Sequence, residues 1–302
     1  MEMDPHDANA LASAEAFLRS RDLTTNDLLS AVGGFEQHEA GLIIGSVASG
    51  YANSLSDLDV MIVGERRGLG PNGVSTSQNY RSVYYRLPSS QKLNVRLYSP
   101  SVVDSLGNKM ERSKTFRENP AQGADMPVLS EWEYIFLHEL RAGAPLSPVV
   151  AQVRASVRAE DLPLHGMMRH VVDHYAARED AIGQTQEGDR RSALWMLRAS
   201  MTSLAQAVLA SVGVTEYRRK WLWRNLERHR SAIGDPQMQM FSELLCDWPA
   251  GDLAAILEKA CAFADQEVAA AFQRKPQLLP LMGFFSSRTP TVTSIAQARA
   301  AS

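Results

Sequence analysis

The chain has 302 residues, of which 45% are hydrophobic and 22% are charged, and its formal net charge is −3. That length is ample for two domains with apolar cores, and the composition is that of an ordinary globular protein. The lack of a basic excess argues against bulk binding of nucleic acid. The acidic start, MEMDPHDANA, does not have a signal-peptide profile, and no apolar run of about 18 residues occurs, so we expect a cytoplasmic protein without a membrane span.

The first third of the chain alternates helix and strand patterns. Residues 8–20 predict an amphipathic helix, and TTNDLLSAVGGF predicts a shorter one that ends at Gly33. The runs GLIIGS and DLDVMIVG predict two short buried strands, with one or two helical turns between them. Residues 64–78 are rich in glycine and predict a loop, after which NYRSVYYRL and KLNVRLYS predict two further strands.

From Val128 onward nearly the whole chain has helical patterns. The segment SEWEYIFLHELRAGAPL begins with a capping box formed by Ser130 and Glu133. Further helices are expected over 147–159, 164–182, 190–212, 216–231, 237–247 and 252–273. We therefore predict an α+β protein with a small mixed β-sheet domain over 1–127, a C-terminal α-helical bundle over 128–282 and a poorly ordered tail over 283–302.

The stretch GSVASGYANSLSDLDVMIV links the first two strands with the spacing Gly45-Ser46, ten residues, Asp57, one residue, Asp59. Alternate residues of a strand share a face, so the two carboxylates are expected to point the same way. Two like charges so placed repel unless a cation lies between them, and carboxylates suit Mg²⁺, which also binds substrate phosphates. Gly45 would let a phosphate approach the backbone, and Ser46 offers a hydroxyl and an amide N–H. The pattern predicts a metal–nucleotide site.

This motif, over residues 41–64, resembles the nucleotidyltransferase superfamily of DNA polymerase β type. It is most similar to the minimal nucleotidyltransferases and to the kanamycin-type antibiotic nucleotidyltransferases, which also place a sheet domain before a helical bundle. The resemblance implies that Asp57 and Asp59 bind one or two Mg²⁺ ions and that Gly45 and Ser46 bind a nucleoside triphosphate, with ATP favoured. An acceptor hydroxyl would then attack the α-phosphate, and pyrophosphate would leave.

Members of this family usually carry a third carboxylate on a later strand. Here the matching strand, KLNVRLYSP, has Asn94 at that position, and an amide can contact a metal weakly but cannot act as a general base. Three explanations are open: another residue supplies the carboxylate, the acceptor needs little activation, or the protein binds nucleotide without turnover. For the first, resemblance to kanamycin-type enzymes implies a glutamate from the helical part, and Glu139, next to His138, is the candidate.

Two other groups of residues have both a structural and a functional interpretation. The basic segment TEYRRKWLWRNLERHR predicts a helix whose apolar residues belong to the core. Related enzymes are similar in placing a helical-domain lysine on the triphosphate, which makes Lys220 and Arg224 candidates for that contact. His170 and His174 lie four residues apart, but no third ligand is in view, so we expect a structural pair rather than a zinc site.

The function predicted from these features is Mg²⁺-dependent transfer of a nucleoside monophosphate to a hydroxyl of a small molecule or a protein. Nucleic acid is not the expected acceptor. The alternative is a nucleotide-binding pseudoenzyme, or an antitoxin-like regulatory partner, with the same fold. A further acid within about 4–6 Å of Asp57 and Asp59 would favour catalysis, whereas Asn94 alone would favour binding.

Overall fold

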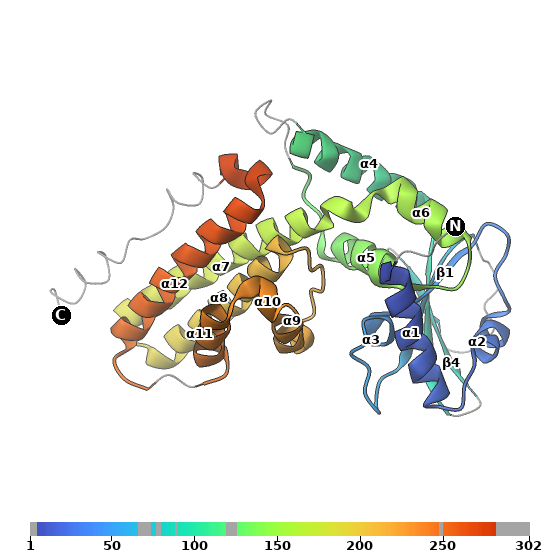
Figure 1. Cartoon of the computed structure of the whole chain (residues 1–302), viewed down its shortest axis with the longest axis horizontal. Helices are drawn as coiled ribbons and strands as arrows, with labels where there is room; N and C mark the ends of the chain where they lie inside the picture. The colour runs from blue at the N-terminus through green and yellow to red at the C-terminus, as the bar shows by residue number, and fades with distance from the viewer. Residues whose placement is uncertain are drawn as a thin grey trace. The chain divides into compact units, whose positions relative to one another are not determined.

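The computed structural model describes residues 5–65, 74–76, 80–87, 90–118, 126–247 and 250–281, and Figure 1 shows its helices and strands. The protein is of the predicted α+β class, with a mixed sheet and a helical C-terminal part. Its contacts divide it into two compact units. We call Met1–Lys114 with Leu129–Glu160 the sheet unit, and Thr115–Val128 with Asp161–Ser302 the helical unit.

The sheet unit is built on six strands in the order β3-β4-β5-β2-β1-β6. β2 runs parallel to β5, and all other neighbours in the sheet are antiparallel. The strands are β1 (Ala40–Ile44), β2 (Leu58–Val63), β3 (Val74–Thr76), β4 (Arg81–Arg86), β5 (Lys92–Tyr98) and β6 (Ala144–Pro145). The four longest correspond to the four predicted strands.

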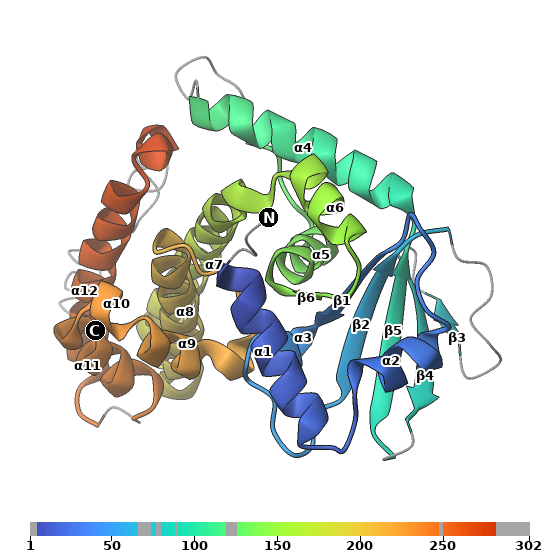
Figure 2. The ribbon, with the colours of Figure 1, turned by 45° about the vertical axis from the view of Figure 1, so that its right-hand side comes forward.

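One face of the sheet is apolar and is covered by α1 (Pro5–Arg19) and α2 (Thr25–Val32), as Figure 2 shows. Leu18 of α1 and Leu28 of α2 are buried in this core. Alternate residues of the central strands β2 and β5 point into it, namely Leu58, Val60, Ile62, Leu93, Val95 and Leu97. Their intervening residues therefore project from the opposite face.

The opposite face carries polar residues and is partly covered by α5 (Glu131–Ala142). Phe136 of α5 packs edge-on against Tyr98 of β5, with ring centroids 4.7 Å apart. The predicted capping box at the start of α5 is confirmed, since Glu133 Oε2 accepts from the Ser130 backbone N–H at 2.7 Å. Lys109 of α4 (Pro100–Glu118) donates to Glu133 Oε1 at 2.6 Å, which ties the start of α5 to α4.

The sheet unit extends past residue 127, where the sequence placed the end of the sheet domain. α5 and α6 (Val149–Val157) pack with the sheet rather than with the later helices. The reason is a set of long-range bonds: β6 pairs with β1, and Arg154 of α6 donates to Asp7 of α1 and to the carbonyl of Leu140. A helical period in the sequence does not reveal such partners.

The helical unit is a bundle whose long helices lie side by side (Figure 1). They are α7 (Leu162–Gln186), α8 (Arg190–Ser211), α11 (Asp235–Leu245) and α12 (Leu253–Arg274). Phe241 and Phe272 are fully buried in their common core, and the rings of Phe241 and Phe263 meet in a T-shaped contact at 5.1 Å. The predicted helical bundle is thus present.

Several local predictions differ from the structure. Residues 216–231 do not form one helix. They form a 3₁₀ turn (Arg219–Trp221) followed by two short helices, α9 (Leu222–Arg228) and α10 (Arg230–Ile233). At the junction of the 3₁₀ turn and α9, Asn225 Nδ2 donates to the Trp221 carbonyl. The predicted loop 64–78 contains β3, which forms because β4 supplies its partner. The predicted tail, residues 283–302, lies outside the described residues.

Among the helices that the structure describes, none combines the length and the apolar character that crossing a bilayer requires.

Candidate functional site

The turn at Gly45 joins β1 to the one-turn helix α3 (Gly45–Ala48). Gly45 has φ +74°, a left-handed conformation that residues with a Cβ adopt only at a cost in free energy. Gly45 is buried and Ser46 is partly exposed. Because Ile44 pairs with Asp59 in the β1–β2 ladder, this turn lies directly beside the start of β2. The structure therefore brings the Gly-Ser pair and the Asp-x-Asp pair together at one end of two neighbouring strands.

The segment before Asp57 is held in a tight turn by its own polar side chains. The Leu55 backbone N–H donates to Asn53 Oδ1 at 2.9 Å, and the Asn53 N–H donates to Ser56 Oγ at 2.9 Å. Gln91 Nε2 donates to the Ser56 carbonyl at 3.0 Å and links this turn to the residue before β5. Asp57 is thus presented by a turn that is braced against the neighbouring strand.

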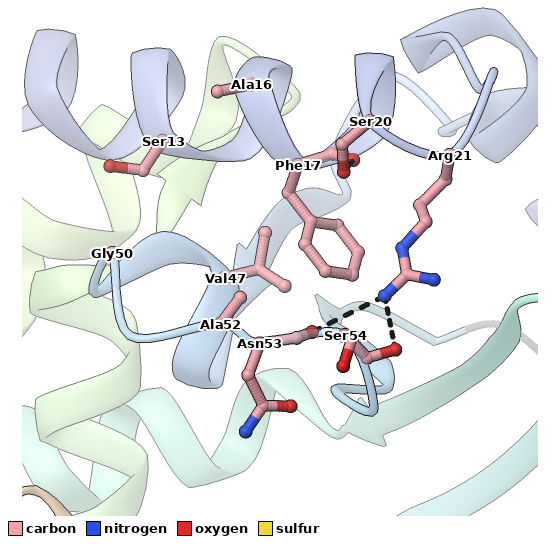
Figure 3. A pocket seen from close by; sticks show the side chains of 10 residues that line it. All are labelled: Ser13, Ala16, Phe17, Ser20, Arg21, Val47, Gly50, Ala52, Asn53 and Ser54. Atoms are coloured by element: carbon pink, nitrogen blue, oxygen red, sulfur yellow. Dashed lines mark hydrogen bonds between the residues drawn. The ribbon is translucent and has the colours of Figure 1, made fainter.

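A cavity of about 650 Å³ lies behind the same turn, between α1 and the segment that follows α3 (Figure 3). Arg21 reaches across it and donates from Nη2 to the carbonyls of Ser54, at 2.5 Å, and Asn53, at 3.4 Å. The Arg21 guanidinium also lies over the Phe17 ring, 5.3 Å from its centroid. Arg21 therefore helps to fix the turn that leads to Asp57.

A row of paired residues crosses the polar face of the sheet. Ile44, Asp59, Asn94 and Tyr84 follow one another across β1, β2, β5 and β4. Asn94 Nδ2 donates to Asp59 Oδ1 at 2.9 Å, and among the described residues Asn94 Oδ1 has no hydrogen-bond partner. The amide at the predicted third-carboxylate position therefore neutralises none of the charge of Asp59 and offers it a single hydrogen bond.

Arg96, two residues further along β5, connects Asp59 to Glu139 of α5. Its Nη1 donates to both carboxylate oxygens of Glu139, at 2.8 and 2.9 Å, and its Nη2 lies 3.6 Å from Asp59 Oδ1. The Glu139 side chain is 1% exposed, and those of Arg96 and Asp59 are each 22% exposed. Burial lowers the pKa of Arg96, but the charges of Glu139 and Asp59 outweigh burial and raise it. Arg96 is thus a fixed positive charge between two carboxylates.

A second cavity, of about 620 Å³, opens beside the row and includes two of its members. Its lining consists of Asp57, Tyr84, Tyr85, Arg86, Lys92 and Asn94. The residues come from the turn before β2 and from the β4–β5 hairpin, so the sheet unit alone forms this cavity. Its volume lies within the range of about 300–1,000 Å³ that is typical of small-molecule sites.

The donor set at Asp57 and Asp59 decides which cation it can hold. Within the described part of the chain, no group of three or more His, Cys, Asp or Glu side chains is arranged to bind a metal. Two carboxylates nevertheless fit a Mg²⁺ ion that takes its remaining ligands from water and substrate phosphates. Asp59 Oδ1 already accepts from Asn94 and faces Arg96, so the protein offers fewer free oxygens than two carboxylates could supply.

The structure relates the other predicted site residues to this centre in different ways. Glu139 is buried rather than on a solvated helix face, and it reaches Asp59 only through Arg96. Lys220 and Arg224 belong to the helical unit, where their charged groups lie 5.0 and 5.2 Å from the centroid of the Trp221 ring. The structure thus places Gly45, Ser46, Asp57, Asp59 and Asn94 at one end of the central strands. Glu139 is connected to Asp59 through Arg96.

Sequence reasoning missed Arg96 and four residues of the second cavity, namely Tyr84, Tyr85, Arg86 and Lys92. Arg96 follows Asn94 at a spacing of two, which places both on one strand face, and that periodicity was the available signal. Arg86 and Lys92 lie opposite each other because of the β4–β5 register, and no local sequence pattern predicts that register. His170 and His174, expected to be structural, are buried in the helical unit, and His174 Nδ1 contacts Ser200 Oγ at 2.8 Å.

The comparisons with known proteins found similarity in structure and none in sequence. No protein-family model and no curated protein sequence matches the chain. Among solved structures, the chain is similar to a nucleotidyltransferase-like protein from Exiguobacterium sibiricum 255-15, with 12% identity and a TM-score of 0.46, over 85% of this chain and 78% of that one.

Proposed function

We propose that the protein is a Mg²⁺-dependent nucleotidyltransferase. It would move a nucleoside monophosphate from a nucleoside triphosphate, with ATP favoured, to a hydroxyl of a small molecule or a protein. The observation that carries the proposal is the meeting of the Gly45 turn with Asp57 and Asp59, which the pairing of Ile44 with Asp59 brings about. A phosphate-accessible backbone beside two carboxylates is the arrangement that a metal-bound triphosphate needs.

The proposed chemistry is an in-line displacement at the α-phosphorus. The acceptor oxygen forms a bond to that phosphorus, the bond to the oxygen bridging the β-phosphorus breaks, and pyrophosphate leaves with the electron pair. Mg²⁺ bound by Asp57 and Asp59 would neutralise the charge on the phosphates. The hydroxyl proton passes to water or to a base, and Glu139 can serve as that base only if it is released from Arg96, which holds both of its oxygens.

The remaining predicted residues take supporting roles in this proposal. Gly45 and Ser46 would contact the triphosphate through backbone and hydroxyl groups. Asn94 would orient Asp59 through its 2.9 Å hydrogen bond, and its unpartnered Oδ1 could contact the metal weakly. Lys220 and Arg224 remain predicted contacts of the triphosphate.

A second candidate function is nucleotide binding without turnover, as in a pseudoenzyme or an antitoxin-like regulatory protein. Two observations favour it: Asn94 stands in register with Asp59 at the predicted third-carboxylate position, and the nearby acid Glu139 is already paired with Arg96. In this second candidate function, Arg96 replaces a second metal ion as the positive charge next to Asp59.

Incubation of the purified protein with each α-labelled nucleoside triphosphate, Mg²⁺ and a cell extract separates the two candidates. The enzyme proposal predicts label transfer and pyrophosphate release with the wild type and a loss of at least about a hundredfold with Asp57→Asn, which removes a metal-binding charge. No transfer with any of the nucleotides would contradict it. Calorimetric binding of nucleotide without transfer would then support the second candidate.

A further inference from the structure

The hairpin formed by β4 and β5 places two cations directly opposite each other. Arg86 pairs with Lys92 in the ladder, both residues are exposed, and within the described residues neither forms an ion pair within 4.0 Å. Like charges at directly opposed positions of an antiparallel pair destabilise the sheet. An anion bound between Arg86 and Lys92 would remove that repulsion.

Tyr84 stands on the same face of β4 as Arg86, two residues before it. It is 53% exposed, although large aromatic side chains usually bury most of their surface when they serve only the core. Its cross-strand partner is Asn94, which is bonded to Asp59. An exposed phenol ring therefore lies beside the cationic pair, in the row of residues that also contains Asn94 and Asp59.

These side chains line one cavity rather than a scattered surface. The cavity of about 620 Å³ has two cations, Arg86 and Lys92, against one carboxylate, Asp57, so its lining carries one net positive charge. Tyr84 and Tyr85 add aromatic surface to it. A cavity of this size, charge and aromatic content is suited to a small ligand that has both a ring and a negative group.

We propose that this cavity binds a compound that carries an anionic group on an aromatic ring. The anionic group meets Arg86 and Lys92, and the ring lies against Tyr84. Guanidinium and ammonium groups recognise carboxylate and phosphate through charge-assisted hydrogen bonds. The ring contact adds selectivity for aromatic over aliphatic anions.

Two sources share this chemistry: a separate aromatic acceptor, and the donor nucleotide itself. We assign the cavity to the acceptor, an assignment that rests on the proposed function, because Asp57 is part of both the cavity and the predicted metal site. An acceptor hydroxyl beside Asp57 would lie next to the metal-bound triphosphate.

The test is calorimetric titration of the full chain with phenyl phosphate, inorganic phosphate and benzyl alcohol, without metal or nucleotide. Phenyl phosphate should bind more tightly than either fragment. The double variant Arg86→Gln/Lys92→Gln should weaken its binding by about tenfold or more, since two charge-assisted bonds are lost. Tyr84→Ser should weaken it about fivefold while Tyr84→Phe retains it, because the ring and not the hydroxyl makes the contact.

A matched control removes the same two charges elsewhere in the sheet unit. Arg19→Gln/Arg112→Gln changes exposed cations that do not line the cavity, and it should leave the affinity unchanged. Absence of phenyl phosphate binding, or equal loss in the control and in Arg86→Gln/Lys92→Gln, would overturn the proposal. Thermal unfolding of each variant shows whether the fold is retained, and Tyr84→Phe serves as the internal reference.

Repeating the titration with saturating Mg²⁺ and ATP distinguishes the two sources. Where calorimetry shows that ATP binds, retained binding of phenyl phosphate supports the acceptor assignment, whereas its displacement overturns that assignment and gives the cavity to the nucleotide. Where ATP does not bind, the acceptor assignment fails together with the proposed function. The first titration contains neither metal nor triphosphate, so failure of the nucleotidyltransferase proposal would not alter its result. The proposed binding of an aromatic anion and the proposed function can therefore fail separately.

Discussion

At the scale of single residues, Glu139 is a buried charge that is paired with Arg96. Its side chain is 1% exposed, and Arg96 holds both of its oxygens. Removal of one partner of a buried ion pair leaves an uncompensated charge, which costs about 3–5 kcal/mol, whereas replacing both partners with neutral groups costs much less.

A double-mutant cycle tests this reading of Arg96 and Glu139. Arg96→Met should lower the free energy of unfolding by about 3–5 kcal/mol, and Glu139→Gln by less, because Arg96 keeps its contact with Asp59. The double variant should be more stable than the sum of the single effects predicts. Urea unfolding gives the coupling energy, and additivity within about 0.5 kcal/mol would show that the pair does not interact.

Gly45 and Gly183 provide a second test at this scale, because the same substitution has opposite expected effects. Gly45→Ala should destabilise the protein by about 1–2 kcal/mol, since φ is +74° there. Gly183→Ala in α7 should stabilise it by about 0.5–1 kcal/mol, because a Cβ there meets no atom within 4 Å and alanine favours the helix. Denaturant midpoints measure both, and destabilisation by both variants to the same degree would refute the argument.

At the scale of elements, the buried residues His170 and His174 of α7 make the stability of the bundle depend on pH. Burial lowers the pKa of His170 and of His174 to about 4, from 6.5. The charges of Arg169 and Arg219 lower that of His170 further, and Arg178 acts in the same direction on His174, against a bond to the Ser200 carbonyl that raises it. Between about pH 4 and 6.5, the two histidines therefore bind protons in the unfolded chain but not in the folded protein.

The sign of the effect follows from these lowered pKa values. Stability is fully present above pH 6.5 and is lost as the pH falls toward 4, at up to about 1.4 kcal/mol per pH unit for each histidine. His174→Gln should reduce this slope, and His38→Gln, at an exposed position, should not. Chemical unfolding between pH 4 and 7 measures the slopes, and identical slopes for the wild type and His174→Gln would contradict the prediction.

The elements themselves were predictable where one local signal was sufficient. Such local signals are the apolar runs of β1 and β2, the capping box of α5 and the amphipathic patterns of the long bundle helices. β3 and β6 were not predicted, since each is short and owes its pairing to a distant strand. α4 was also missed, because its sequence, PSVVDSLGNKMERSKTFRE, has a glycine in its interior and few apolar residues.

The site divides in the same way between local and long-range features. Gly45, Asp57 and Asp59 could be predicted together because they lie in one short stretch of the sequence. The bond from Asn94 to Asp59 required the parallel register of β2 and β5, and the pairing of Arg96 with Glu139 required the packing of α5 on the sheet. A sequence pattern predicts candidate metal ligands, but it does not show which of their carboxylates are paired with a neighbouring side chain in the folded protein.

At the scale of the whole molecule, the predicted metal–nucleotide centre and the second cavity both lie in the sheet unit. The helical unit holds the remaining predicted contacts, Lys220 and Arg224. If these cations meet the triphosphate, Lys220→Gln and Arg224→Gln should each weaken nucleotide binding by about three- to tenfold, since each removes one exposed charge contact. Calorimetry with Lys259→Gln as the matched control measures this, and unchanged affinity would contradict both predicted contacts.

The most direct measurement is calorimetric titration of ATP with Mg²⁺ into the wild type, Asp57→Asn and Asp59→Asn. Nucleotide binding should be lost when Mg²⁺ is chelated, and it should weaken by at least about tenfold in each variant, because the two carboxylates are proposed to hold the cation that bridges the phosphates. Equal affinity in all three proteins, or binding that is independent of the metal, would contradict this prediction.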